Sequence, residues 1–183
     1  ATTEAEQQAR IATLFDINQL NSRNLSAFTK LKELQGEDGG WSWYKGMSGS
    51  RHITGYITEL LVRLPLLTKN ELPEEVAAVR QKAFGYLNRQ ALEEYRNIRK
   101  SEKNGARIVG NSEAAMTYLY LIALSGEKVP AENQAAYRYF LSKVAANLEN
   151  GTMSSKAQSA IILKAAGRIT EANEFIASLK EHL

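Results

Sequence analysis

Proline occurs only three times in this chain of 183 residues, and this scarcity constrains the fold more than any other feature. Proline interrupts helices, so its rarity leaves long stretches in which a helix can continue. These stretches are rich in Ala, Leu, Glu, Lys and Gln, which have high helix propensity. No segment shows the strict alternation of apolar and polar residues that is typical of a strand. The sequence therefore predicts an all-α protein.

Apolar residues recur at helical spacing in about eight segments. We expect helices at about residues 2–20, 24–34, 53–64, 73–99, 112–125, 131–148, 154–166 and 170–179. The third helix is expected to stop near Pro65, and the charged end of the fourth is expected to extend into water. Connections of a few residues imply antiparallel neighbours. Such helix pairs form either an open solenoid or an α/α toroid, and no repeat of fixed length separates the two.

Size and composition suggest one helical domain over residues 1–183. A hydrophobic content of 44% is enough for a sizeable core, and the length is that of a typical domain. Because the chain starts with Ala-Thr-Thr, we expect it to be an excised fragment of a much larger multidomain protein.

Charge and residue usage exclude several function classes. The net charge is only +3, and no cluster of Lys and Arg with interleaved aromatic residues is apparent, so nucleic acid is not an expected partner. The chain has no cysteine, and its only histidines are His52 and His182, so we expect no disulfide, no metal site and no cofactor. No apolar run is long enough for direct membrane insertion.

The stretch from Leu31 to Leu61 is the most distinctive part of the chain. The helical pattern breaks at Gly36, where a positive φ could close the helix, and Asp38-Gly39-Gly40 predicts a tight turn. Trp41 and Trp43 alternate with a serine, so we expect both indoles to leave the loop on one side. There they would pack over helix ends as a lid.

Several residues of this stretch allow a chemical interpretation beside a structural one. Glu37 and Asp38 are adjacent carboxylates, but a structural turn is favoured over an acid and base pair. His52 has no partnered nucleophile, so a cap or packing role is favoured over proton transfer. For Thr54, a hydrogen bond within its own helix is favoured over a role as a nucleophile.

The aromatic residues of this stretch also leave two interpretations. Trp41, Trp43, Tyr44 and Tyr56 could form a platform for a carbohydrate or an apolar ligand. Packing between helices is the favoured interpretation, because large aromatic side chains are usually buried. We expect no catalytic residue here.

The motif resembles the thioester-type helical domain of bacterial alpha-2-macroglobulin-like proteins. The residues that carry the resemblance are Gln35, Asp38, Gly39, Gly40, Trp41, Trp43, Thr54 and Tyr56. The likeness is specific over residues 34–64 and looser over residues 25–170. It favours the α/α toroid, as a partial ring of antiparallel helix pairs.

The resemblance implies a non-enzymatic domain of a protein that traps or inhibits endopeptidases in the periplasm or at the cell surface. Its partners would be the other domains of the parent protein and, in the intact protein, the target proteases. Reactive members of the family form an internal thioester at a Cys-Gly-Glu-Gln-like motif. This chain has no cysteine and Glu6-Gln7-Gln8 is not that motif, so no thioester can form within it.

Enzymes built on the same ring are the alternative. Terpenoid cyclases, protein prenyltransferase subunits and polysaccharide-processing toroids also carry the Gln, Asp-Gly and Trp pattern. The cyclases require an Asp-rich motif or a diphosphate site with metal ligands, and the prenyltransferases require a Cys/His/Asp zinc site; the chain has neither. A third possibility is a helical-repeat scaffold with a concave charged groove.

Overall fold

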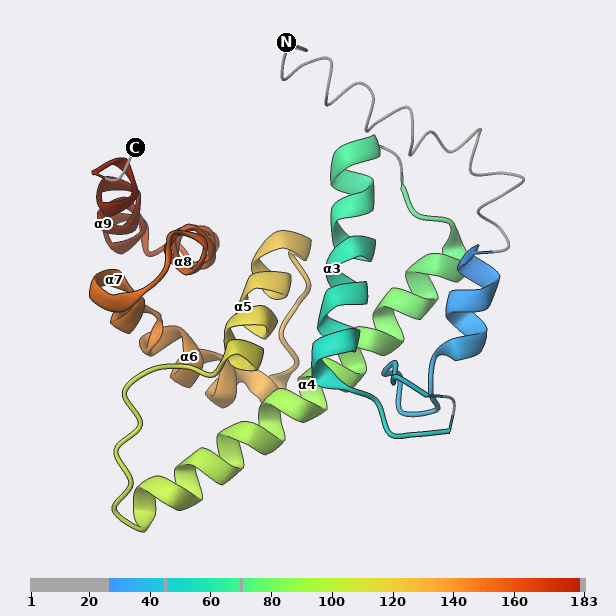
Figure 1. Cartoon of the computed structure of the whole chain (residues 1–183), viewed down its shortest axis with the longest axis horizontal. Helices are drawn as coiled ribbons and strands as arrows, with labels where there is room; N and C mark the ends of the chain where they lie inside the picture. The colour runs from blue at the N-terminus through green and yellow to red at the C-terminus, as the bar shows by residue number, and fades with distance from the viewer. Residues whose placement is uncertain (1–26, 45, 70, 182–183) are drawn as a thin grey trace. The chain divides into compact units, whose positions relative to one another are not determined.

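The computed structural model of the protein describes residues 27–44, 46–69 and 71–181. Within these residues 74% of the chain is helical and no strand is present, which confirms the all-α class. The helix predicted over residues 2–20 and the start of the next one lie outside the described residues. The elements are the helical residues 27–34, α3 (Arg51–Thr68), α4 (Glu74–Lys103), α5 (Glu113–Ser125), η1 (Ala131–Asn133), α6 (Gln134–Ser142), η2 (Val144–Ala146), α7 (Asn147–Asn150), α8 (Met153–Ala165) and α9 (Ile169–Lys180) (Figure 1).

The chain divides into two compact units, one up to Tyr86 and one from Leu87 onward. The boundary between Tyr86 and Leu87 falls inside α4. The prediction of one domain over residues 1–183 stays a prediction.

Helix α3 continues past the proline that was expected to end it. Ser50 caps its first turn by accepting a hydrogen bond from the backbone N–H of Ile53. Pro65 lies inside the helix, which ends only at Thr68. A proline removes one backbone bond, but only the last turn follows it here. Lys69 then closes the helix in the left-handed conformation, with its N–H donating to the carbonyl of Pro65 at 2.9 Å.

The core of the first unit forms where residues 27–34, α3 and the first half of α4 meet. Trp41 lies at its centre and is only 2% exposed. The other buried members of this core are Leu61, Val76, Val79 and Ala83, with Phe28, Leu31, Ile53, Ile57 and Leu72 packed against them. Burying these side chains holds a loop residue and three helical segments together.

Helix α5 packs against α6 and α8 in the second unit. It is buried on every side, since Tyr118, Leu119, Tyr120, Leu121 and Ile122 are all buried in succession. Its ends follow the prediction. Ser112 caps the start, and Gly126 ends the helix at a φ of 68°.

The single helix predicted over residues 131–148 is wrong, because the chain breaks at Lys143 into α6, η2 and α7. The break leaves backbone carbonyls at the end of α6 without helical partners. Two side chains distant in sequence bind them. Asn111 donates to the carbonyl of Phe140 at 2.8 Å, and Arg168 donates to that of Leu141 at 3.0 Å. These tertiary hydrogen bonds stabilise the interruption.

The second half of α4 is not surrounded by water as expected. Tyr95 packs edge-on against Tyr139 and Phe140 of α6, with ring centroids 5.3 and 6.5 Å away. Glu93 and Arg96 are exposed. The helix therefore covers α6 with one face and keeps its charged face in solvent.

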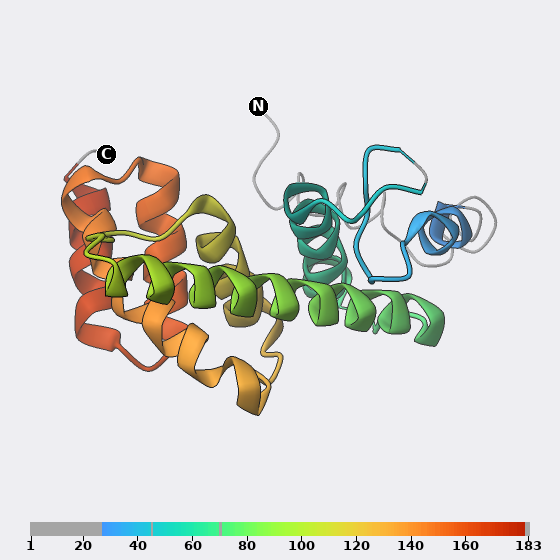
Figure 2. The same ribbon diagram turned by 90° about the horizontal axis from the view of Figure 1, so that it is seen from below.

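Helices α8 and α9 complete the second unit. They pack against each other, joined by a short turn in which Gly167 has a φ of 77° (Figure 2). Helix α8 also packs against α5. No helix within the described ranges is long and apolar enough to cross a membrane.

Candidate functional site

The loop between residue 34 and α3 is held closed by the carboxylate of Asp38. One oxygen accepts from the backbone N–H of Gly40 at 3.0 Å, and the other accepts from that of Gly49 at 2.9 Å. The first is a local turn contact, whereas the second joins the two ends of the loop. A carboxylate is the side chain suited to this position, since both of its oxygens must accept. Glu37 beside it is exposed.

Gln35 ties the same loop to α4. Its amide nitrogen donates to the carbonyl oxygens of Gly39 and Val79, both at 2.9 Å. Val79 lies 44 positions later, in the first half of α4. One side chain therefore binds the turn and the neighbouring helix together.

Trp41 fixes the loop to helices on both of its sides. Its indole N–H donates to the carbonyl of Leu31 at 2.9 Å, near the end of the helical residues 27–34. The last carbonyls of a helix lack helical partners, so the indole acts as a cap. The backbone N–H of Trp41 donates to the hydroxyl of Thr54 in α3 at 2.9 Å. The expectation of a bond within the helix for Thr54 is wrong, because this hydroxyl binds the loop; Thr58 makes such a bond instead, to the Thr54 carbonyl at 2.6 Å.

Three glycines let the loop approach its surroundings closely. A Cβ on Gly39, whose φ is 84°, would lie 2.4 Å from the carbonyl oxygen of Lys82. A Cβ on Gly40 or Gly49 would lie about 3 Å from the other glycine and from the ring of Tyr86. The hydroxyl of Tyr86 donates to the Gly49 carbonyl at 2.5 Å. Gly36 has no positive φ, so the helix ends without the expected glycine cap.

The structure does not bring the remaining aromatic residues of the motif into this closure. Trp43 is 76% exposed, and Tyr44 and Tyr56 are 73% and 64% exposed. The predictions of a lid of two indoles and of packing for all four aromatics are therefore wrong for these three residues. Residues at positions i and i+2 point to the same side only in an extended strand. This segment is a loop, so the alternation of Trp41 and Trp43 in the sequence does not place them on one side.

The closure leaves few groups for chemistry. Asp38 binds two N–H groups, and Thr54 is fully buried and binds Trp41. His52 is exposed on α3. No three His, Asp or Glu side chains gather as a metal site would require, as far as residues 27–44, 46–69 and 71–181 show. What the arrangement can do is hold the two flanking helices and α4 in a fixed relation.

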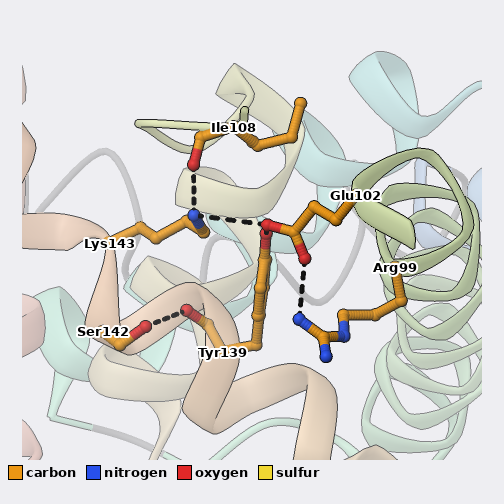
Figure 3. Close-up of polar contacts among 6 residues, drawn as sticks. All are labelled: Arg99, Glu102, Ile108, Tyr139, Ser142 and Lys143. Carbon is orange, nitrogen blue, oxygen red and sulfur yellow. Dashed lines mark hydrogen bonds and ion pairs between the residues drawn. The ribbon is translucent and has the colours of Figure 1, made fainter. Parts of the chain in front are cut away.

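A second polar cluster lies in the other unit, and the sequence analysis missed it. The carboxylate of Glu102, in the last turn of α4, accepts from the hydroxyl of Tyr139 at 2.6 Å and from Arg99 at 2.7 Å (Figure 3). Lys143 lies 3.8 Å from the same carboxylate and also donates to the backbone carbonyl of Ile108. The spacing of Arg99 and Glu102 was visible as a helical ion pair, but their contact with α6 was not.

The surroundings of these groups shift their pKa values in opposite directions. The hydrogen bond from Tyr139, together with Arg99 and Lys143, lowers the pKa of Glu102 below 4.5 despite partial desolvation. Burial raises the pKa of Tyr139, and the carboxylate that it binds adds to this shift. The phenol thus stays protonated and keeps donating to Glu102. Its ring also faces two cations, with Arg99 and Lys143 at 5.8 and 4.8 Å from the centroid.

These observations define an all-α protein whose motif residues close a loop on its own helices. Neither a family model, nor a curated protein, nor a solved structure matches this chain.

Proposed function

We propose that the chain is a non-enzymatic helical domain of an alpha-2-macroglobulin-like protein that traps or inhibits endopeptidases. The observation that carries the proposal is the use of the motif: Gln35, Asp38, Trp41 and Thr54 all bind the loop or its neighbouring helices. A motif whose residues hold a loop closed fits a domain that transmits or resists movement. The side chains of Asp38 and Thr54 are then engaged within the protein.

The proposed arrangement is an α/α toroid, as a partial ring of antiparallel helix pairs. Its support is the short connection between packed neighbours, as in α8 and α9. Each such pair could take its place around a ring whose other pairs the parent protein supplies.

The proposed partners are sister domains of the parent protein, and target proteases in the intact protein. Exposed large apolar side chains support a contact surface on the first unit. They are Trp43, Tyr44 and Met47 of the loop and Tyr56 and Leu60 of α3. The proposal places the parent in the periplasm or at the cell surface, without contact with nucleic acid and without direct membrane insertion by this domain.

A protease assay on the longer protein that contains this chain tests the function. An excess of that protein is mixed with a series of endopeptidases, and cleavage of a large protein substrate is compared with cleavage of a small peptide substrate. A trap reduces the first and spares the second, because the enclosed protease still admits small molecules. Equal activity on both substrates, with and without the protein, would refute the proposal.

Methylamine uptake separates two forms of the trap. Incorporation into the longer protein would reveal a thioester outside this segment, since residues 1–183 contain no cysteine. Trapping without uptake would indicate a thioester-free relative that shields the protease sterically.

A further inference from the structure

The positive charge of the chain is concentrated at the end of α4 and in the segment after it. Residues 96–107 contain five basic residues and one acidic residue, whereas the whole chain has a net charge of only +3. The basic residues are Arg96, Arg99, Lys100, Lys103 and Arg107. A local excess that is larger than the net charge of the chain creates a positive potential at this end of the second unit.

Several of these side chains line one open depression. We call it the basic depression, and its lining residues are Arg99, Glu102, Lys103, Ala106, Arg107 and Ile108. It lies where α4 ends and the chain turns at Gly105, whose φ is 92°, into the extended segment that leads to α5 (Figure 1). The depression therefore combines a helix end with a loop.

The pairing of charges divides the basic side chains into two groups. Glu102 takes its hydrogen bonds and ion pairs from Arg99, Tyr139 and Lys143, so its charge is compensated from within the protein. Lys103 and Arg107 are exposed and have no carboxylate partner among the residues that the structure describes. Two cations at the edge of the depression thus remain available to an outside anion.

Helix stabilisation explains only part of this charge. Lys100 and Lys103 lie in the last turn of α4, where cations interact favourably with the helix dipole. Arg107 lies beyond the helix, so its position is not accounted for in this way. The same applies to Lys143, which lies between α6 and η2 and reaches the carbonyl of Ile108.

The shape and composition of the basic depression select the kind of ligand. Small ligands bind in enclosed pockets, and this depression is open to solvent. Single-stranded nucleic acid requires aromatic faces for stacking, but the ring of Tyr139 faces Arg99 and Lys143. An extended chain with separate carboxylates beside apolar groups meets none of these obstacles.

We propose that the basic depression binds an acidic polypeptide segment of a partner protein, with Lys103 and Arg107 pairing with its carboxylates. Ala106 and Ile108 provide apolar contact between the charges. Attraction at the rim of such a surface acts mainly on the rate of association and falls with salt. The inference does not depend on the proposed function.

Binding of a fluorescently labelled peptide that alternates glutamate with leucine to the whole chain tests this proposal. Anisotropy is measured at low and at physiological ionic strength for the unsubstituted chain and for the double variant K103E/R107E. The expected result is binding that weakens with salt and a loss of about tenfold in affinity in the variant. The double variant K103Q/R107Q removes the charges without reversing them and should lose less.

A matched control separates a local surface from net charge. Lys164 and Lys180 are exposed lysines in the last turns of α8 and α9, so K164E/K180E changes the net charge and the helix ends equally. This control should bind the peptide with the affinity of the unsubstituted chain, and circular dichroism should show that all variants are folded. An equal loss in both charge-reversed variants, or no binding at low salt, overturns the proposal. So does an oligothymidylate of equal charge that binds as tightly with the same dependence on Lys103 and Arg107.

Discussion

The indole nitrogen of Trp41 donates a hydrogen bond of 2.9 Å to the carbonyl oxygen of Leu31. This contact caps the end of one helix with a side chain from the loop that follows it. Because Trp41 is also only 2% exposed and belongs to the core of the first unit, a single side chain couples the end of the helix to the core. The second tryptophan, only two residues later, has no comparable position.

Replacing the two tryptophans one at a time should therefore give very different results. Trp41→Phe removes the donor to Leu31 and part of the buried ring, so we expect a loss of about 1–3 kcal/mol in the free energy of unfolding. Trp43→Phe should change it by less than about 0.5 kcal/mol, because Trp43 is exposed. Urea unfolding measures both values. Tryptophan emission checks the assignment, since the protein that retains only Trp41 should emit at shorter wavelength.

Replacing the carboxylate of Asp38 with an amide should destabilise the protein. In Asp38→Asn only one oxygen can accept, so either Gly40 or Gly49 loses its partner and meets a second donor. We expect a loss of about 1–3 kcal/mol in unfolding free energy. Glu37→Gln is the control, since the neighbouring carboxylate is exposed, and it should be nearly neutral. Equal effects of the two changes would mean that the carboxylate of Asp38 does not close the loop.

The close approach at Gly40 predicts a specific cost for a methyl group. A Cβ there would lie 3.0 Å from the Cα of Gly49 and from the ring of Tyr86, so Gly40→Ala must displace one of them. We expect a destabilisation of about 1–3 kcal/mol. Gly110→Ala is the matched change in open space, with no atom within 4 Å, and should be neutral or slightly stabilising. Thermal unfolding followed by circular dichroism compares the two variants.

The lowered pKa of Glu102 predicts a contribution to stability that is lost at low pH. Because its pKa in the folded protein lies below the ordinary 4.5, this group stabilises the fold above that value. The contribution is lost as the pH falls through the folded pKa, when the carboxylate gains a proton. Glu102→Gln should therefore reduce the dependence of unfolding free energy on pH below 4.5.

Urea unfolding at a series of acidic pH values measures this dependence. Glu149→Gln is the control, since Glu149 is an exposed carboxylate on α7 that forms no ion pair in the described part of the chain. If the unfolding free energy of Glu102→Gln depends on pH in the same way as that of the unsubstituted chain, the pairing of Glu102 is contradicted.

Much of the helical pattern could be predicted from the sequence, because the signals are local. Ser112, Gly126 and Gly167 mark helix ends through contacts within a few residues, and they lie at or next to the bounds predicted for the helices 112–125, 154–166 and 170–179. The apolar stripe of α3 identifies its buried face only in part, because Leu61 is buried whereas Tyr56 and Leu60 of the same stripe are exposed. The prediction of one helix over residues 131–148 was wrong because the side chains that stabilise the break, Asn111 and Arg168, lie far from it in the sequence.

The candidate site divides in the same way. By itself, the sequence determined that the chain is helical and that a turn at Asp38 and Gly39 interrupts it, because helix propensity and turn chemistry act over a few neighbouring residues. Only the tertiary structure decided that Trp41 is buried while Trp43 is exposed, and that Glu102 meets Tyr139 from 37 residues away. Burial and long-range pairing depend on which surfaces meet in space, and apolar spacing along one helix does not specify its partner.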